Sequence, residues 1–209
     1  MKDRGYINKE EPSKKLTNQG MILGMSAIVY RISGTNKYVS KNLNKDHDVE
    51  VLRIDVNMVN ASDEINIEEL RQWQPQYNDA EFILENGKYI VGREVEKMSK
   101  RWFNVVNPDD ICEQYGADTL RLYEMFLGRL EQAKPWNTAG ITGVSGFLKK
   151  LWKLYFDDNG LIVTSNPASK EAYKILHKTI KKVQEDIENF SFNTSVSSFI
   201  IAVNELTAL

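Results

Sequence analysis

The pattern of apolar and polar positions changes near residue 107, from short runs to helical stripes. Between residues 25 and 94, β-branched and aromatic runs are separated by turn signals at 33–36 and 85–87. Runs of this kind predict strands. We predict one helix, ending before Pro75, and five strands. The predicted helix covers 67–73, and the predicted strands cover 29–32, 37–40, 49–59, 80–84 and 88–91.

From residue 107 onward, apolar residues recur at helical spacing. Asn107 is a good N-cap, Pro108 suits the first helical position, and Gly116 ends the predicted helix. A second helix is predicted from about Asp118 to Gly128. The remaining elements are a turn at 135–137 and three helices with apolar stripes at 144–155, 175–187 and 196–206. The chain stops inside the last stripe, so we expect it to be a piece of a longer protein.

The first nineteen residues are polar and carry several lysines. They predict a short helix over 13–16 that is stopped by Gly20. Residues 21–23 are predicted as the buried end of a strand. The N-terminal segment is therefore expected to lead directly into the strand-rich region.

Charge is distributed unevenly along the 209 residues, although the net charge is only −2. Ten acidic residues lie between Asp48 and Glu85, whereas eight lysines lie between Lys149 and Lys182. This asymmetry predicts separate modules with different partners. The single cysteine excludes an internal disulfide and fits a reducing cytoplasm. No apolar run approaches the roughly 18 residues of a membrane span, so a cytoplasmic protein is expected.

Five consecutive residues form the strongest candidate for chemistry: Lys97, Met98, Ser99, Lys100 and Arg101. Ammonium groups on a mobile loop ahead of a helix can swing onto the phosphates of a nucleotide. The five residues are therefore predicted to form a loop that holds a polyphosphate. Met98 is expected to pin the loop by packing, and Ser99 to supply a hydroxyl or a loop-shaping hydrogen bond. The alternative interpretation is a solvated surface loop.

The downstream context favours the phosphate loop and carries a resemblance. The chain reads Lys-Met-Ser-Lys at 97–100, Asn-Pro at 107–108, Tyr-Gly-Ala-Asp-Thr-Leu-Arg at 115–121 and Trp at 136. Together with Lys-Leu at 15–16 and Gln-Gly-Met at 19–21, these residues resemble the leucyl-tRNA synthetase family, a class I aminoacyl-tRNA synthetase. Arg101 departs from the serine that follows the lysine in that family, and Arg129 from a proline.

The resemblance implies an α+β chain of four parts. Residues 1–24 would end a Rossmann catalytic domain, and 25–94 would form a small α/β insertion of the leucine-specific type. Residues 95–137 would hold the signature loop and stem-contact helices. Residues 138–209 would form part of a mainly α-helical, anticodon-binding-like bundle. The N-terminal catalytic domain, with its His-Ile-Gly-His motif, and the editing domain are not in this chain, so the chain alone is expected to be inactive.

The resemblance also implies the reaction and its partners. Leucine would be activated with ATP, Mg²⁺ is expected to accompany ATP, and the leucyl group would pass to tRNA(Leu). The signature residues Lys97, Met98, Ser99, Lys100 and Arg101 would contact the ATP phosphates. Lys97 and Lys100 would be the catalytic pair, with Lys100 the more essential of the two. No metal site is predicted within the chain itself. Candidate tRNA contacts are Arg121, Lys149, Lys150 and Lys153. The structural alternatives are an Asp118–Arg121 ion pair and a solvated lysine face.

Two further interpretations remain open at this stage. Trp136 is expected to pack between domains rather than to stack on a base. A free-standing helical RNA-binding adaptor without catalysis is the alternative function. The adaptor predicts RNA affinity with a steep salt dependence and no need for a partner.

Overall fold

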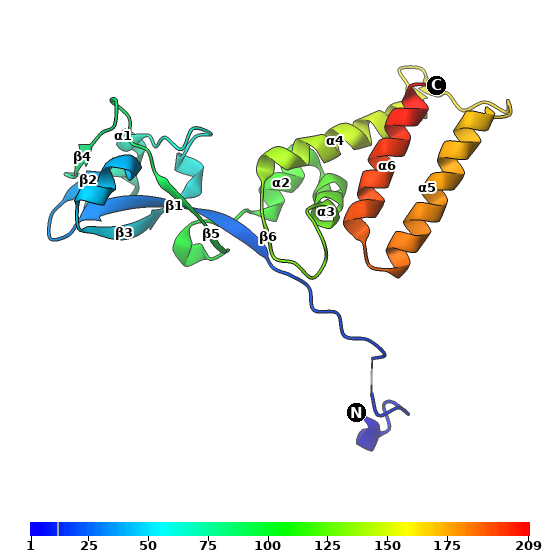
Figure 1. Cartoon of the computed structure of the whole chain (residues 1–209), viewed down its shortest axis with the longest axis horizontal. Coiled ribbons are helices and arrows are strands. Elements are labelled where there is room, and N and C mark those ends of the chain that lie inside the picture. Colours follow the sequence, from blue (N-terminus) through cyan, green and yellow to red (C-terminus); the bar gives the residue numbers. More distant parts are fainter. Residues whose placement is uncertain (12) are drawn as a thin grey trace.

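The computed structural model describes residues 1–11 and 13–209, and one long strand joins its sheet-rich and helix-rich halves (Figure 1). That strand is β1, Ile22–Ile32. At its start, Leu23 pairs with Lys97 on one side and with Pro135 on the other. Since a strand residue has one neighbour on each edge, β1 brings two distant chain segments together at this point.

The sheet is mixed. β1 pairs antiparallel with β2, β3 and β5 and parallel with β6, while β4 pairs parallel with β2. The five partner strands are β2 (Lys37–Val39), β3 (Val49–Ile54), β4 (Glu81–Ile83), β5 (Gly92–Lys97) and β6 (Lys134–Pro135). Residues 25–94, here termed the acidic module, therefore form most of the sheet.

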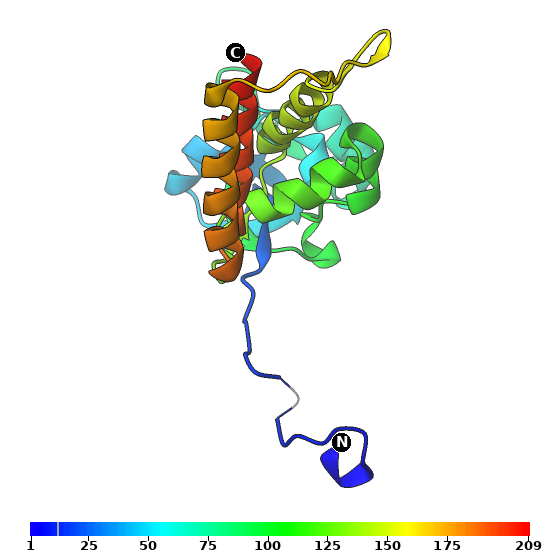
Figure 2. The same cartoon turned by 90° about the vertical axis from the view of Figure 1, so that its right-hand side faces the viewer.

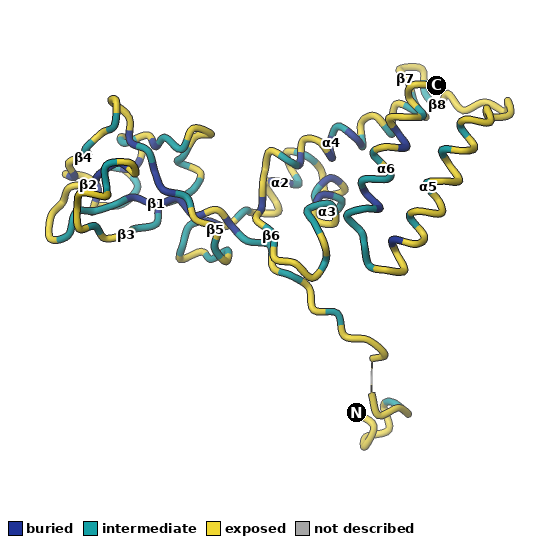
Figure 3. The backbone as a smooth tube through the Cα atoms, viewed as in Figure 1, coloured by how far each residue is buried: buried dark blue, intermediate teal, exposed yellow. Residues whose placement is uncertain are grey.

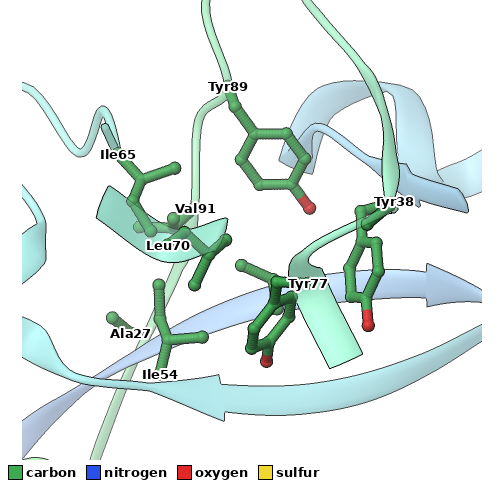
Figure 4. Close-up of a cluster of buried hydrophobic side chains, with 10 residues drawn as sticks. Ala27, Tyr38, Ile54, Ile65, Leu70, Tyr77, Tyr89 and Val91 are labelled. Carbon is green, nitrogen blue, oxygen red and sulfur yellow. The ribbon is translucent and has the colours of Figure 1, made fainter. Parts of the chain in front are cut away.

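The core of the acidic module lies between the sheet and α1, Ile67–Trp73 (Figure 4). Asn66 caps this helix, because its side chain accepts hydrogen bonds from two backbone N–H groups. Tyr89 is buried, and its hydroxyl donates to the Val39 carbonyl at 2.8 Å and accepts from the Tyr30 N–H at 3.2 Å. The cluster thus satisfies this buried hydroxyl. Its buried members are Ala27, Val29, Tyr38, Ile54, Ile65, Leu70, Tyr77, Ala80, Tyr89 and Val91.

Five α-helices follow β5: α2 (Pro108–Tyr115), α3 (Ala117–Phe126), α4 (Thr138–Lys153), α5 (Lys170–Glu188) and α6 (Phe192–Thr207). A small hairpin, β7 (Phe156–Asp157) with β8 (Gly160–Leu161), follows α4. A second core gathers Ile111, Tyr123, Trp136, Ile141 and Val144. Much of α5 and the first residues of the chain are exposed (Figure 3). The first residues extend away from the rest of the chain (Figure 2). None of the helices formed by the described residues combines the length and apolar character that a membrane crossing requires.

Several predicted elements are confirmed. The helix over 67–73 matches α1, and Asn107 caps α2 by accepting a hydrogen bond from the Asp109 N–H at 3.2 Å. Gly116 ends α2 with φ 87°, a left-handed backbone that favours glycine. Helices over the other three stripes are also present. The coarse prediction of a mixed α and β chain therefore holds.

The prediction for the N-terminal segment was wrong in part. Residues 13–16 form no helix, since they are exposed and have no packed face to support one turn. Ile22 and Leu23 begin β1, so a strand is present as predicted, but both are only half-buried, and Met21 is 53% exposed and lies outside the strand. The strands predicted near residues 22 and 29 are one strand. Gly24 interrupts the apolar pattern there because a Cβ would lie 2.5 Å from the Asn104 carbonyl oxygen.

Three other predictions need correction. Strand β3 stops at Ile54, and residues 56–58 form a 3₁₀ turn capped by Asp55. Residues 88–91 form only isolated bridges, whereas the strand lies at 92–97, where charged residues hide the pattern. Residues 134–135 pair with β1 instead of starting a turn, which an edge position allows for proline.

Candidate functional site

The signature segment, residues 97–101, is part strand and part turn rather than a free loop. Lys97 is the last residue of β5, and residues 100–102 form a 3₁₀ turn. The Ser99 hydroxyl accepts a hydrogen bond from the Arg101 N–H at 3.3 Å, which shapes this turn. Lys97, Lys100 and Arg101 are exposed, and no ion pair involving them is found among the described residues. Three cations are thus presented to solvent together.

The ends of the signature segment are fixed to different cores. Met98 is half-buried and packs against the helical core that contains Trp136. Phe103, which follows the turn with φ 53°, packs edge-on against Trp73 of α1 at a ring distance of 4.8 Å. The expected packing role of Met98 is therefore present. Lys100 lies between these two anchors.

Asn104 holds the segment from inside. Its side chain is almost fully buried, at 1% exposure. The carboxamide oxygen accepts from the Ser99 N–H at 2.9 Å, and the amide nitrogen donates to the Lys97 carbonyl at 3.3 Å. The same nitrogen donates to the Ser26 hydroxyl at 3.0 Å. One side chain thus bridges β1, the end of β5 and the start of the turn.

A carboxylate continues this network toward β3. The Ser26 hydroxyl donates to Glu96 at 2.6 Å, and the Arg53 Nε donates to the same carboxylate oxygen at 2.8 Å. A second Arg53 nitrogen donates to the other oxygen of Glu96. The Arg53 guanidinium also lies 4.7 Å from the ring centre of Trp102, a cation–π geometry. The turn is therefore tied to the acidic module through both Asn104 and Trp102.

The hydrogen bonds from Arg53 hold the pKa of the Glu96 carboxyl below its ordinary value of 4.5, and burial opposes them. Because the pKa is lower in the folded state, the pair stabilises the fold at neutral pH. This stabilisation is lost as the pH falls below 4.5 through the folded pKa. We therefore expect Arg53→Met to raise the pKa of Glu96, measured by NMR titration of its carboxyl carbon.

Arg31→Met is the matched control for this titration, since Arg31 pairs with Glu50 on the same sheet. It removes an equal charge and should leave the pKa of Glu96 unchanged. An Arg53→Met variant whose Glu96 pKa stays where it was would contradict the assigned hydrogen bonds.

The sequence did not reveal the residues that support the segment. Asn104, Ser26, Glu96 and Arg53 come from three strands and a loop, and their contacts span up to 78 positions. The one local signal is that Asn104 is a polar residue between Phe103 and Val105. A polar residue in such a run would be predicted as exposed, whereas it is buried and fully engaged.

The four candidate tRNA contacts are exposed and come from two helices. Lys149, Lys150 and Lys153 lie at the end of α4, and Arg121 lies on α3. Lys150 donates to the Asn204 side chain of α6 at 3.0 Å, so it helps to pack the helices. The expected ion pair between Asp118 and Arg121 is not formed in the part of the chain that the structure describes.

Trp136 is a buried packing residue, and its buried partners all belong to the helical core. It is 9% exposed and makes an edge-on contact with Tyr123 at a ring distance of 5.1 Å. Its indole N–H donates to the Thr138 hydroxyl at 3.0 Å, and its burial leaves the ring little surface on which a base could stack. His177 is exposed and stacks on Tyr173. Within residues 1–11 and 13–209, no three metal-ligating side chains come together.

The sequence that forms this site is similar to known proteins. The family described as "tRNA synthetases class I (I, L, M and V)" matches residues 81–135, which contain the signature segment and Asn104. The leucine–tRNA ligase of Flavobacterium johnsoniae is 69% identical over 209 residues, covering 100% of this chain and 22% of the ligase. The leucine–tRNA ligase of Parabacteroides distasonis is 60% identical over 208 residues, covering 99% of this chain and 22% of that ligase.

The structure also matches a solved LeuRS of Agrobacterium radiobacter K84, which is in a ternary complex with tRNA and LeuAMS. The match covers 61% of this chain and 18% of the LeuRS chain. The TM-score is 0.45 and the identity 21%, a likeness too weak to carry an argument about the fold.

The lysine-bearing segment thus lies in the part of the chain that matches the class I aminoacyl-tRNA synthetase family model. Along nearly its whole length, the chain is similar to one segment of several leucine–tRNA ligases, at 55–69% identity. The chain spans about a fifth of the length of these relatives.

Proposed function

We propose that this chain is the part of a cytoplasmic leucine–tRNA ligase that presents the phosphate-binding lysines and part of the tRNA platform. The observation that carries the proposal is the pair of exposed ammonium groups, Lys97 and Lys100, on a segment fixed between two cores. The homology over the whole chain supports the choice of leucine as the amino acid. None of the relatives described above is an RNA-binding adaptor, so nothing favours that alternative.

The chemistry follows from the charge that develops. Attack of the leucine carboxylate on the α-phosphate of ATP forms leucyl-adenylate and breaks the bond to pyrophosphate. Such a substitution needs positioning and electrostatic stabilisation more than covalent help from the protein. Negative charge grows on the departing pyrophosphate, so cations that meet it in the transition state accelerate the step. We assign this role to Lys97 and Lys100.

The rest of the signature segment supports these two lysines. Met98 fixes the segment through packing, Ser99 shapes the turn, and Arg101 adds a third cation toward the phosphates. Mg²⁺ would arrive bound to ATP and be held by phosphate oxygens. The described residues offer no cluster of metal ligands of their own.

The homology also supports an assignment of the chain's parts. Residues 1–24 would end the Rossmann catalytic domain, and residues 25–94 would be the leucine-specific insertion. Residues 95–137 would form the signature segment and stem-contact helices, and 138–209 part of the anticodon-binding bundle. The observed sheet and its core fit the second part, and α4 to α6 fit the fourth.

The exposed lysines of α4 are the proposed tRNA platform. Lys149 and Lys153 lie one helical turn apart, and neither is in an ion pair among the described residues. Contacts of lysine with phosphate position RNA without reading its sequence. Lys150 and Arg121 are proposed as further contacts, although the Lys150 ammonium group also donates a hydrogen bond to the Asn204 side chain.

The proposed function is tested by exchanging a segment. This chain would replace the matching segment of the Flavobacterium johnsoniae ligase, with which it is 69% identical. We expect the chimaeric ligase to catalyse leucine-dependent ATP–pyrophosphate exchange and to charge tRNA(Leu), while the isolated chain does neither. A folded chimaera without exchange activity would contradict the proposal. So would salt-sensitive RNA binding by the isolated chain together with an inactive chimaera, the result that an adaptor predicts.

A further inference from the structure

Asn104 makes three side-chain hydrogen bonds: it accepts one and donates two. Its oxygen needs a donor, which is the Ser99 N–H, and its nitrogen needs acceptors, which are the Lys97 carbonyl and the Ser26 hydroxyl. A carboxamide is the side chain that offers an acceptor and two donors at one position. The contacts therefore select asparagine and fix the orientation of its amide.

The surroundings leave Asn104 little freedom to move. Gly24 lies so close that a Cβ there would be 3.0 Å from the carboxamide carbon. The Ser26 hydroxyl accepts from Asn104 and donates to Glu96, whose carboxylate is held by Arg53. Networks in which every buried group is satisfied hold one arrangement firmly. The position of Asn104 is thus set by the sheet.

The bonded groups lie next to the candidate lysines. Asn104 holds the backbone carbonyl of Lys97 itself and the backbone N–H of Ser99, the residue before Lys100. The Lys97 carbonyl and the Ser99 N–H belong to neighbouring peptide units on either side of Met98. One side chain therefore sets the path of the backbone between the two ammonium groups. Misplacement of a reacting group by about 1 Å can cost 10²-fold in rate.

We propose that Asn104 is a positioning residue that fixes the backbone between Lys97 and Lys100, so that both ammonium groups meet the departing pyrophosphate. This role rests on the proposed function. Asn104 itself touches no substrate, and it acts through the lysines. Its support from Ser26 and Glu96 makes the sheet of the acidic module part of the catalytic apparatus.

The key variant is Asn104→Asp in the chimaeric ligase, because aspartate has nearly the same shape. One carboxylate oxygen still accepts from the Ser99 N–H, but the other replaces a donor and faces the Lys97 carbonyl. We expect kcat for pyrophosphate exchange to fall by roughly 10²-fold, with little change in KM for ATP. Asn36→Asp is the matched control, because Asn36 is exposed and its replacement by aspartate adds the same charge to the acidic module. It should leave kcat unchanged.

A double-mutant cycle with Lys100→Ala separates positioning from general damage. If Asn104 acts by placing the lysines, Asn104→Asp should cost much less in the Lys100→Ala background than in the parent. Ser26→Ala is a milder second variant that leaves both bonds from Asn104 to the segment in place. It should lower kcat by a smaller factor, and that factor should also shrink in the Lys100→Ala background.

These variants test the positioning role of Asn104 separately from the proposed function. Losses that shrink in the Lys100→Ala background support the positioning role. Losses of the same factor in both backgrounds would overturn it while leaving the proposed function intact. A Lys100→Ala ligase that works at full speed would overturn the proposed function, and the positioning role with it.

Discussion

Replacing Lys100 by alanine should lower kcat for leucine-dependent pyrophosphate exchange by about 10²–10³-fold in the chimaeric ligase. The ammonium group is exposed and lies outside any ion pair among the described residues, so its removal breaks no structural contact that they show. The expected loss therefore reflects lost stabilisation of the transition state. KM for ATP should change little, because an interaction made only in the transition state lowers kcat and kcat/KM equally.

Lys45→Ala is the matched control, since Lys45 is an exposed lysine of the acidic module far from residue 100 in the chain. It should leave exchange unchanged. A Lys100→Ala variant with unchanged kcat and a raised KM for ATP would assign Lys100 to ground-state binding instead. That outcome would contradict the proposed role.

The second large effect concerns the acidic module that supports the segment. Leu70 is fully buried on α1, inside the cluster of tyrosines and aliphatic residues (Figure 4). Leu70→Ala removes packed atoms and leaves a cavity, so it should destabilise the module by about 2–5 kcal/mol. Native-state amide hydrogen exchange measures this locally. We expect faster exchange at the amides of β1 to β4, with smaller changes in α5 and α6.

The control for this variant is Leu84→Ala, because Leu84 is 38% exposed in the same module. Its effect should stay within about 0.5 kcal/mol. Equal destabilisation by both variants would contradict the assigned core. Since Phe103 packs against Trp73 of the same helix, Leu70→Ala should also slow pyrophosphate exchange.

Local signals predicted the helical part of the fold well. Asn107, Pro108 and Gly116 each act on the backbone of the helix beside them, so their effect can be read from a few neighbouring residues. The same holds for Asn66 and α1. Helix boundaries of this kind depend little on the rest of the molecule.

The sheet could not be predicted in the same way, because its strands are chosen by partners far along the chain. β1 contains Gly24 and Ser26 at positions where a local pattern favours a break, yet both are buried by contact with Asn104. β5 consists mostly of charged residues, and one of them, Glu96, is held by Arg53 of β3. Those contacts exist only once the strands have paired.

In the candidate site, too, local sequence predicts some residues, whereas others depend on tertiary contacts. Lys97 and Lys100 are predicted from a short signature and its downstream context, because the role proposed for them needs exposure and charge rather than a tertiary contact. The support from Asn104 was not predicted, since it depends on bonds that join three separated segments. The expected mobile loop is, in this structure, a segment that is well anchored at both ends.

The proposed mechanism requires that the ammonium groups of Lys97 and Lys100 neutralise the charge of the departing pyrophosphate. Its most direct test is the single-turnover rate of leucyl-adenylate formation at saturating ATP, with Lys97 and Lys100 both replaced by alanine in the chimaeric ligase. We predict a rate at least 10²-fold below that of the parent, while Lys41→Ala/Lys45→Ala retains the parental rate. Adenylate formation at the parental rate without either ammonium group would contradict the account.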